Sequence, residues 1–204
     1  MFDIRVLIVE DDPIIAEDIK EMLTNVDYSV SGIAYTKEEA IRIIDKKKPD
    51  LALLDINLNG QHDGYTIAEY INKSRKIPFL YLTSYSGKEF VEKAKHTLPM
   101  GYILKPFREA ELYSSIEVAL YNFSKFILPL NLSRDIINSH LTQPLTDREF
   151  DILKDLYDGK TNQQLAEKNF VSVNTVKTHL KNIFEKLDTH SRSETIARLN
   201  ELLR

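Results

Sequence analysis

The chain has 204 residues, of which 43% are hydrophobic and 28% are charged. This balance supplies enough apolar material for a folded core and excludes a wholly disordered or collagen-like protein. The absence of cysteine excludes a disulfide-stapled scaffold, a thiolate metal site and a cysteine nucleophile. No apolar run approaches the roughly 20 residues that a membrane-spanning helix needs, so we expect a cytoplasmic protein. The formal net charge of −4 argues against a protein that mainly coats nucleic acid.

Residues 1–122 alternate short apolar runs with helix-length amphipathic stretches. Strands that are apolar throughout are buried on both faces, and their alternation with helices is typical of a doubly wound α/β domain with a five-stranded parallel sheet. Ligands of such domains bind beyond the carboxyl ends of the strands. The predicted strands are 4–9, 29–35, 50–55, 77–83 and 101–104. The predicted helices, which have apolar residues at three- and four-residue spacing, are 13–24, 37–45, 63–72, 87–96 and 109–123.

The strand–helix alternation ends near residue 123, and only helical patterns follow the next twenty or so residues. Residues 123–142 contain Pro129 and are predicted to form a linker, the first part of which extends the preceding helix. Residues 143–204 are predicted to form a small all-α domain. Its first helix begins at a capping box formed by Thr146 and Glu149. Further helices are expected near 161–168, at 172–187, and from Ser191 or Ser193 to about residue 203.

Carboxylates follow two of the predicted strands. Glu10 and Asp11 come directly after the first strand, and Asp55 ends the third. Clustered carboxylates repel one another and raise one another's pKa values unless a hard cation is present. Mg²⁺ suits such a cluster because it takes one or two carboxylates and completes its octahedron with waters and phosphate oxygens. Thr83 and Lys105, at the ends of the fourth and fifth strands, would hold the phosphoryl oxygens that the metal leaves free.

This arrangement resembles the receiver domain of two-component response regulators, over residues 3–122. The resemblance implies that Asp55 accepts a phosphoryl group from a sensor histidine kinase or a small phosphodonor, with Mg²⁺ as cofactor. Asp11 would be a direct metal ligand, Glu10 would act mostly through water, and the backbone carbonyl of Asn57 would be a further ligand. Lys105 would bridge the acid and the phosphate. The protein would then be a phosphoacceptor that assists its own phosphorylation and dephosphorylation, and not an enzyme.

The resemblance also implies a conformational switch. The hydroxyl of Thr83 would move toward the phosphoryl group, and the ring of Tyr102 would turn inward. The bond between Lys105 and Pro106 would be cis. Asp12 would cap the helix that follows it.

The loop after Asp55 departs from the family pattern. It is one residue longer than usual, and Asn59 stands where many members have proline. These changes remove no chemical group. They bear on the shape of the loop that faces the kinase and on the lifetime of the phosphoryl group, which should also depend on Asn57 and Tyr85.

The helix predicted at 172–187 has two different faces. At about 100° per residue, one arc faces the core and contains Val173, Val176, Leu180, Ile183, Phe184 and Leu187. The opposite face and its flank are polar, with Asn174, Lys177, Thr178, Lys181 and Glu185. Such a face suits a solvated surface, or a recognition helix that presents lysine, threonine or asparagine to base edges and phosphates.

The stretch from Leu145 to Glu194 resembles the LuxR/NarL type of helix-turn-helix. The residues that carry the resemblance are Leu145, Thr146, Arg148, Glu149, Gly159, Asn162, Leu165, Ala166, Ser172, Thr175, Val176, Lys177, His179, Lys186 and Leu187. The resemblance implies that the long helix enters the major groove of promoter DNA and that the chain binds as a homodimer. The implied base contacts are Lys177, Thr178 and Lys181, and the implied backbone contacts are Asn162, Asn174 and Thr175.

Two other functions compete with this interpretation. A phosphatase that works through an aspartyl phosphate usually has a second aspartate two residues after the nucleophile, where this chain has Asn57. A receiver with a C-terminal module for protein or RNA is the second alternative, against which Lys177, Thr178 and Lys181 argue.

The charge is divided unevenly along the chain. Residues 1–122 hold 15 basic and 20 acidic residues, residues 123–142 hold 2 and 1, and residues 143–204 hold 10 and 10. The acidity therefore belongs to the first domain. We expect each copy to bind DNA weakly by itself, so that pairing on adjacent half-sites matters.

Overall fold

The computed structural model describes residues 4–26, 28–74, 76–126 and 132–203. The described chain separates into two compact units, one of residues 4–119 and one that begins at Leu120. No helix within the described ranges is long and apolar enough to cross a membrane.

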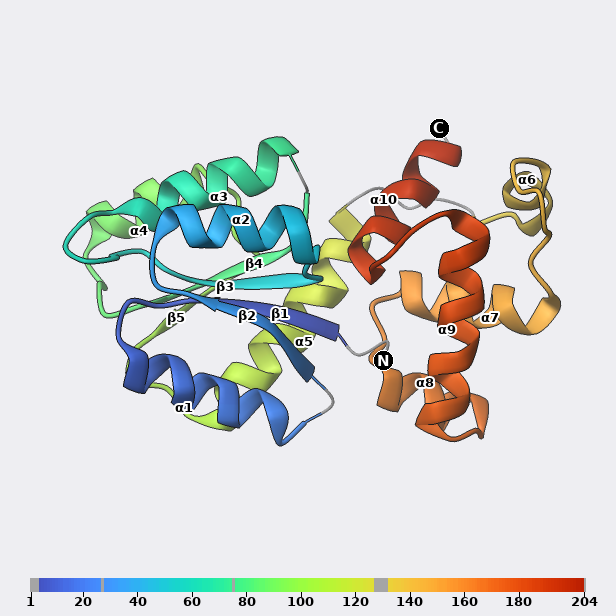
Figure 1. The fold of residues 1–204 in the computed structure, drawn as a ribbon, viewed down its shortest axis with the longest axis horizontal. Helices are drawn as coiled ribbons and strands as arrows, with labels where there is room; N and C mark the ends of the chain where they lie inside the picture. The colour runs from blue at the N-terminus through green and yellow to red at the C-terminus, as the bar shows by residue number, and fades with distance from the viewer. Residues whose placement is uncertain (1–3, 27, 75, 127–131, 204) are drawn as a thin grey trace. The chain divides into compact units, whose positions relative to one another are not determined.

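The first unit is a five-stranded parallel sheet with helices on both faces, which confirms the predicted doubly wound α/β fold. Figure 1 shows α1 and α5 on one face of the sheet and α2, α3 and α4 on the other. The strands are β1 (Ile4–Val9), β2 (Tyr28–Ala34), β3 (Leu51–Asp55), β4 (Phe79–Thr83) and β5 (Gly101–Leu104). The helices are α1 (Pro13–Thr24), α2 (Lys37–Lys47), α3 (Asp63–Ser74), α4 (Lys88–Lys95) and α5 (Glu109–Phe126).

The strand order β2-β1-β3-β4-β5 places the candidate site. After β1 the chain adds β2 on one side, and from β3 onward it adds strands on the other side. This reversal separates the connections at the carboxyl ends of β1 and β3 and leaves a crevice there, where α/β sheets bind ligands. Val9 and Leu54 are paired across these two strands, so the residues that follow them lie at the same edge of the sheet.

The core of the sheet follows from the apolar strand sequences. Every residue of β3 and β4 is buried, and Phe79 and Tyr81 are among the largest fully buried side chains. The predicted cap of α1 is confirmed: Asp12 accepts the backbone N–H groups of Ile14 and Ile15, and Pro13 occupies the first helical position.

The second unit is helical, as predicted. Its helices are α6 (Arg134–Ser139), α7 (Asp147–Tyr157), α8 (Asn162–Asn169), α9 (Val173–Leu187) and α10 (Arg192–Leu202). The capping box of α7 is confirmed, because Thr146 accepts the N–H of Glu149 and the Glu149 carboxylate accepts the N–H of Thr146. The core-facing side of α9 is buried as predicted at Val176, Leu180, Ile183, Phe184 and Leu187, whereas Val173, also predicted on this side, is only partly buried.

A short helix, α6, lies within the segment that the sequence indicated as a linker. It buries Ile137, and the side chain of Asn138 bonds both the N–H and the carbonyl of Leu145. Six residues are too few for helical periodicity to emerge from the sequence. The predicted extension of the preceding helix is present, because α5 continues to Phe126.

Candidate functional site

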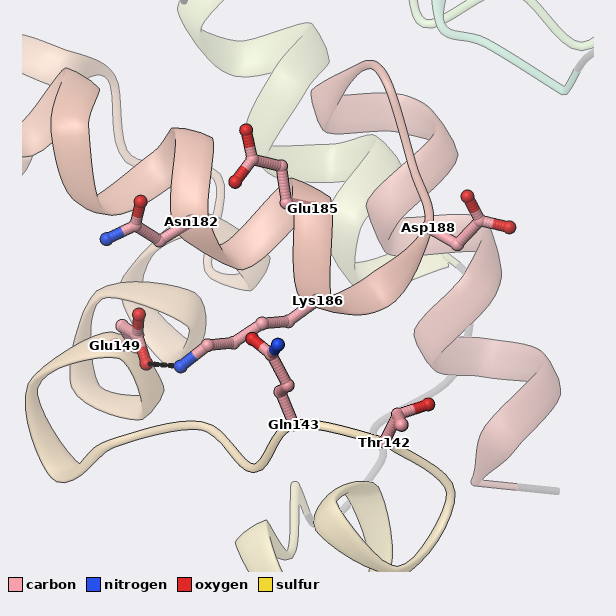
Figure 2. Close-up of a pocket in the computed structure, with 7 residues that line it drawn as sticks. All are labelled: Thr142, Gln143, Glu149, Asn182, Glu185, Lys186 and Asp188. Atoms are coloured by element: carbon pink, nitrogen blue, oxygen red, sulfur yellow. Dashed lines mark hydrogen bonds and ion pairs between the residues drawn. The ribbon is translucent and has the colours of Figure 1, made fainter.

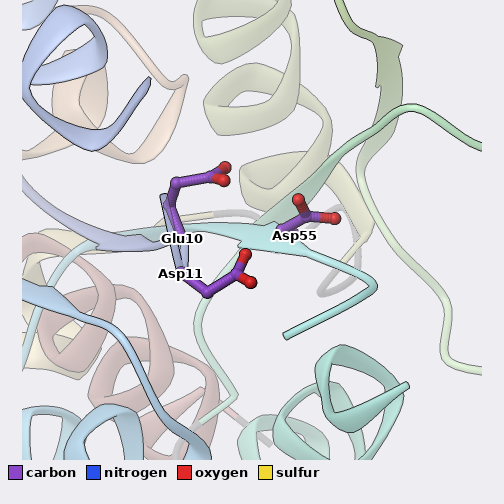
Figure 3. Close-up of side chains that lie close together, drawn as sticks. All are labelled: Glu10, Asp11 and Asp55. Atoms are coloured by element: carbon purple, nitrogen blue, oxygen red, sulfur yellow. The ribbon is translucent and has the colours of Figure 1, made fainter. Parts of the chain in front are cut away.

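Three carboxylates converge at the carboxyl edge of the sheet. Glu10 and Asp11 follow β1, and Asp55 ends β3. One carboxylate oxygen of each lies within 4.8 Å of the others, and Figure 3 shows the three side chains extending toward a common space. Glu10 is 2% exposed and Asp55 is 8% exposed. Asp55 is more than forty positions from Glu10 and Asp11 in sequence, and the parallel sheet brings the three acids together as predicted.

Lys105 neutralises part of this cluster. Its ammonium lies 2.5 Å from Oδ2 of Asp55 and also forms an ion pair with Glu10. Burial by itself lowers the pKa of Lys105, but the hydrogen bonds to Asp55 and Glu10 outweigh that effect and hold the pKa above its usual value. Burial raises the pKa of Glu10, although the hydrogen bond from Lys105 opposes it. The bond between Lys105 and Pro106 is cis, as predicted.

The donor set fits a divalent cation with oxygen ligands. Three carboxylates and one ammonium leave a formal charge of −2 (−3 + 1) at the cluster. The N–H of Asn57 donates to Oδ1 of Asp55 at 3.1 Å, and the Oδ1 of Asn57 is buried without a partner among the described residues. Hard oxygen donors of this kind suit Mg²⁺. The sequence predicts the backbone carbonyl of Asn57 as a ligand. The side-chain oxygen of Asn57 is a further acceptor without a partner among the described residues.

Thr83 and Tyr102 are both hydrogen-bonded to the backbone of one residue, Tyr85. Thr83 is fully buried at the end of β4, and its hydroxyl accepts the N–H of Tyr85 at 3.2 Å. The hydroxyl of Tyr102 donates to the carbonyl of Tyr85 at 2.6 Å. Burial raises the pKa of Tyr102, and the charge of Asp55 raises it further. The two residues expected to form a switch are therefore linked through the backbone of Tyr85.

The longer loop after β3 ends in a tight turn beside the acids. Leu58 and Gln61 exchange backbone hydrogen bonds of 2.8 and 2.9 Å, and the two residues between them, Asn59 and Gly60, have φ values of 52° and 81°. Two central residues with positive φ are typical of a type I′ turn, for which Asn-Gly is a preferred sequence. The N–H of Asn59 donates to Oδ2 of Asp11 at 2.9 Å. A backbone donor thus orients one of the predicted metal ligands.

Apart from the carbonyl of Asn57, sequence reasoning missed the backbone groups at this site. The N–H of Asn59 binds Asp11, and the N–H and the carbonyl of Tyr85 bind Thr83 and Tyr102. Because every residue other than proline has both backbone groups, residue type gives no signal for such contacts. The only signal for the turn was the dipeptide Asn59-Gly60.

The comparisons with known proteins agree with this geometry. The family model described as the response regulator receiver domain matches residues 6–117, which is more than half of the chain. The chain belongs to the response regulators. A second family model, described as bacterial regulatory proteins of the luxR family, matches residues 143–199 of this response regulator. It therefore contains a receiver domain and a LuxR-type DNA-binding domain.

Several relatives of this response regulator match over nearly the whole chain. The transcriptional regulatory protein YhcZ of Bacillus subtilis is 31% identical over 93% of this chain and 92% of its own length. The response regulator protein VraR of Staphylococcus saprophyticus is 31% identical over 95% of this chain and 94% of its own. The solved structure of the response regulator ChrA, from a heme-sensing two-component system, is 30% identical with a TM-score of 0.50, and it covers 99% of this chain and 100% of its own.

The predicted DNA contacts are not all placed alike. Asn174, Thr178 and Lys181 are exposed on α9, and Thr175 and Lys177 are partly exposed. Asn162 differs, because it is 1% exposed at the start of α8. Its side chain lies in the interior of the C-terminal unit and is therefore left out of the DNA surface proposed below.

A polar pocket of about 730 Å³ lies at the far end of α9, and Figure 2 shows its lining residues. Lys186 crosses this space from α9 to reach the Glu149 carboxylate on α7 at 2.6 Å. Burial alone raises the pKa of Glu149, but the hydrogen bonds from Lys186 and Thr146 outweigh it, so the pKa lies below its usual value. The pocket was not predicted, although Glu149 and Lys186 both belong to the motif that carries the helix-turn-helix resemblance.

Proposed function

We propose that this response regulator accepts a phosphoryl group on Asp55 in a Mg²⁺-dependent reaction and, as a homodimer, binds promoter DNA to regulate transcription. The observation that carries the proposal is the buried Asp55 carboxylate, which shares the Lys105 ammonium with Glu10 inside a cluster of three acids. We infer a receiver domain at 1–122, a linker at 123–142 and a DNA-binding domain at 143–204. We also infer a sensor histidine kinase as the partner and the cytoplasm as the location.

The residues at the site divide the work of phosphoryl transfer. A carboxylate oxygen of Asp55 attacks phosphorus, the bond from phosphorus to the donor nitrogen or oxygen breaks, and the donor atom keeps the electron pair. Asp11, Asp55 and the carbonyl of Asn57 would hold Mg²⁺, with Glu10 acting through water. When bound, Mg²⁺ offsets the negative charge on the phosphoryl oxygens.

Lys105 and Thr83 supply the remaining contacts to the phosphoryl group. The Lys105 ammonium is already beside Asp55 and remains protonated at neutral pH, so it can pair with a phosphoryl oxygen without a change of protonation. The hydroxyl of Thr83 would turn from the N–H of Tyr85 toward another phosphoryl oxygen. This movement frees the Tyr85 segment to which Tyr102 is bonded. Phosphorylation thereby shifts a pre-existing equilibrium between two arrangements of this region.

Phosphoryl labelling tests the receiver proposal. The full chain is incubated with Mg²⁺ and a small radiolabelled phosphodonor, and protein-bound label is counted. Asp55→Asn should abolish labelling, whereas Asp12→Asn, which changes an exposed helix cap, should leave it in place. Label that persists on Asp55→Asn would refute the assignment of the phosphoacceptor.

DNA binding at two salt concentrations tests the second half of the proposal. The full chain is titrated onto duplexes, with and without the phosphodonor, and the affinity and its salt slope are recorded. Lys181→Ala should weaken binding and lower the slope by about one, because one phosphate or base contact from a cation is lost. Unchanged affinity and slope would remove α9 as the recognition helix. Preferential binding of single-stranded RNA or of protein would support the alternative module.

A further inference from the structure

Phe170 lies between α8 and α9 in a conformation that needs an explanation. Its side chain is 95% exposed, the highest value among the large hydrophobic residues that the structure describes as exposed. It is also the C-terminal cap of α8, with φ 55° and ψ 42° in the left-handed region.

Neither the backbone nor the packing of the described chain favours phenylalanine here. Glycine or asparagine adopts the left-handed cap with little strain, while an aromatic residue with a Cβ is disfavoured in it. A phenylalanine normally offsets such strain by burying its ring in the core, but this ring is almost wholly in contact with water. The ring therefore gains nothing within the described chain that glycine would not provide.

The position of Phe170 places its ring beside the DNA-reading end of α9. Ser172, which caps α9 by accepting the N–H of Thr175, is two residues later. Two residues span at most about 7 Å of backbone. Recognition helices of helix-turn-helix domains contact base edges with their N-terminal residues. The turn before α9 therefore lies at the border of the groove that Asn174 and Thr178, which are exposed in the first turns of the helix, would enter.

We propose that Phe170 makes an apolar contact with duplex DNA at the N-terminal end of α9. The inference rests on the proposed DNA binding by this helix. The partner chemistry is the apolar carbon surface of DNA, which two groups provide: the methyl group of thymine in the major groove and the carbon atoms of deoxyribose along the backbone. Binding removes the ring from water and offsets the strain of the cap, so an aromatic residue is favoured here in the complex and not in the free chain.

Replacement of Phe170 by two residues suited to the left-handed cap tests the proposal. The full chain and its Phe170→Gly and Phe170→Asn variants are titrated onto duplexes of about 30 base pairs, enriched from a random library by binding to the unchanged chain. Both variants should melt at or above the temperature of the unchanged chain, because the backbone strain is relieved. Both should bind roughly tenfold more weakly with an unchanged salt slope, since no cation is lost.

Two further measurements complete the test. One identifies which group of the DNA the ring contacts, and the other distinguishes failure of this inference from failure of the proposed function. Duplexes with uracil in place of thymine lack the methyl group. If the unchanged chain binds these duplexes only as tightly as Phe170→Gly does, the contact is to the thymine methyl group. If the unchanged chain still binds them more tightly than Phe170→Gly, the contact is to deoxyribose. Lys181→Ala is the matched control, expected to lower both affinity and slope.

Three results would overturn the inference. Equal affinity of Phe170→Gly, Phe170→Asn and the unchanged chain, while Lys181→Ala binds weakly, would refute the role of Phe170 alone. A reduced salt slope in both Phe170 variants would show that the residue acts by moving the cations of α9. Failure of the unchanged chain to bind duplex DNA would refute the proposed function, and the contact with it.

Discussion

At the scale of single residues, the ammonium of Lys105 stabilises the folded chain by balancing the charge of the acidic site when no cation is bound. Its side chain is 10% exposed and pairs with the buried carboxylates of Glu10 and Asp55. Lys105→Met leaves Glu10 and Asp55 facing each other without a counter-charge. Breaking a buried ion pair by removing one partner costs about 3 kcal/mol, so we expect the free energy of unfolding to fall by about that amount in the absence of divalent cations.

Urea denaturation with EDTA and with Mg²⁺ measures this effect. Added Mg²⁺ should restore part of the lost stability of Lys105→Met, because a bound cation neutralises the same carboxylates. Lys20→Met is the control, since Lys20 pairs with Glu17 on the surface and should change stability little. Equal urea midpoints for Lys105→Met and the unchanged chain in EDTA would contradict the assigned charge balance.

Side chains that carry charge were the part of the site that the sequence could predict. Glu10, Asp11 and Asp55 stand at strand ends, where parallel strands share an edge, so their convergence follows from the fold class alone. The contacts of Asn59 and Tyr85 depend on backbone direction in two loops, which residue type does not specify. The burial of Asn162 was missed for a related reason: a polar residue at a helix start suggests exposure unless the packing of the other helices is known.

At the scale of elements, the start of α3 is held directly against the end of β3. A Cβ on Gly64 would lie 2.2 Å from the carbonyl oxygen of Asp55 and 2.7 Å from Cα of Ile56. Both neighbours are backbone atoms, which cannot move aside as a flexible side chain can. Gly64→Ala should therefore displace the strand end that carries the phosphoacceptor.

We expect Gly64→Ala to lower the free energy of unfolding by about 1 to 3 kcal/mol and to slow phosphoryl labelling by at least about tenfold, since small displacements of reacting groups are costly. Urea denaturation and labelling with a small phosphodonor measure the two effects. Gly60→Asn is the matched control, because Gly60 has open space around it and asparagine tolerates its positive φ. Normal labelling by Gly64→Ala would show that Asp55 does not depend on this close approach.

The contact of α7 with α9 predicts a pH dependence of the C-terminal unit. The folded-state pKa of Glu149 lies below the usual value of 4.5, because the bonds from Lys186 and Thr146 outweigh burial. A lowered pKa contributes stability that is present above the unfolded pKa and is lost as the pH falls through the folded pKa. Glu149→Gln should therefore cost about 1 to 2 kcal/mol at pH 7 and flatten the loss of stability below about pH 4.5.

Denaturation of both proteins between neutral pH and about pH 3.5 measures this difference. Glu185→Gln is the control, because Glu185 lies on the same pocket but pairs with Lys181 on the surface. A parallel pH dependence of Glu149→Gln and the unchanged chain would show that the buried ion pair is not the source.

Helical periodicity and helix caps predicted nearly every helix, and the exceptions have physical causes. α6 is a helix of only six residues that is stabilised by the buried side chain of Ile137 and the hydrogen bonds of Asn138, neither of which leaves a periodic pattern in the sequence. The end of α8 at Phe170 has no glycine to indicate it, although the backbone there is left-handed as it would be with glycine.

At the scale of the whole molecule, the charge distribution determines the expected affinity for DNA and its dependence on salt. The receiver carries the acidity, and the C-terminal 62 residues (143–204) hold ten basic and ten acidic residues. Several of these cations are held by acids of the same unit: Lys160 and Lys168 by Asp155, and Lys186 by Glu149. One copy therefore offers few cations to phosphates, and its affinity for DNA should be low and only weakly dependent on salt.

This distribution predicts that the salt slope reports the number of copies bound. Each neutralised phosphate contributes about 0.9 to the slope of log affinity against log salt concentration. A duplex with two half-sites one helical turn apart should bind two copies and show about twice the slope of a duplex with one half-site. The phosphodonor should raise affinity for the double site far more than for the single one, if phosphorylation favours pairing. Equal slopes on the two duplexes, with one copy bound to each by sedimentation, would mean that the chain reads DNA as a monomer.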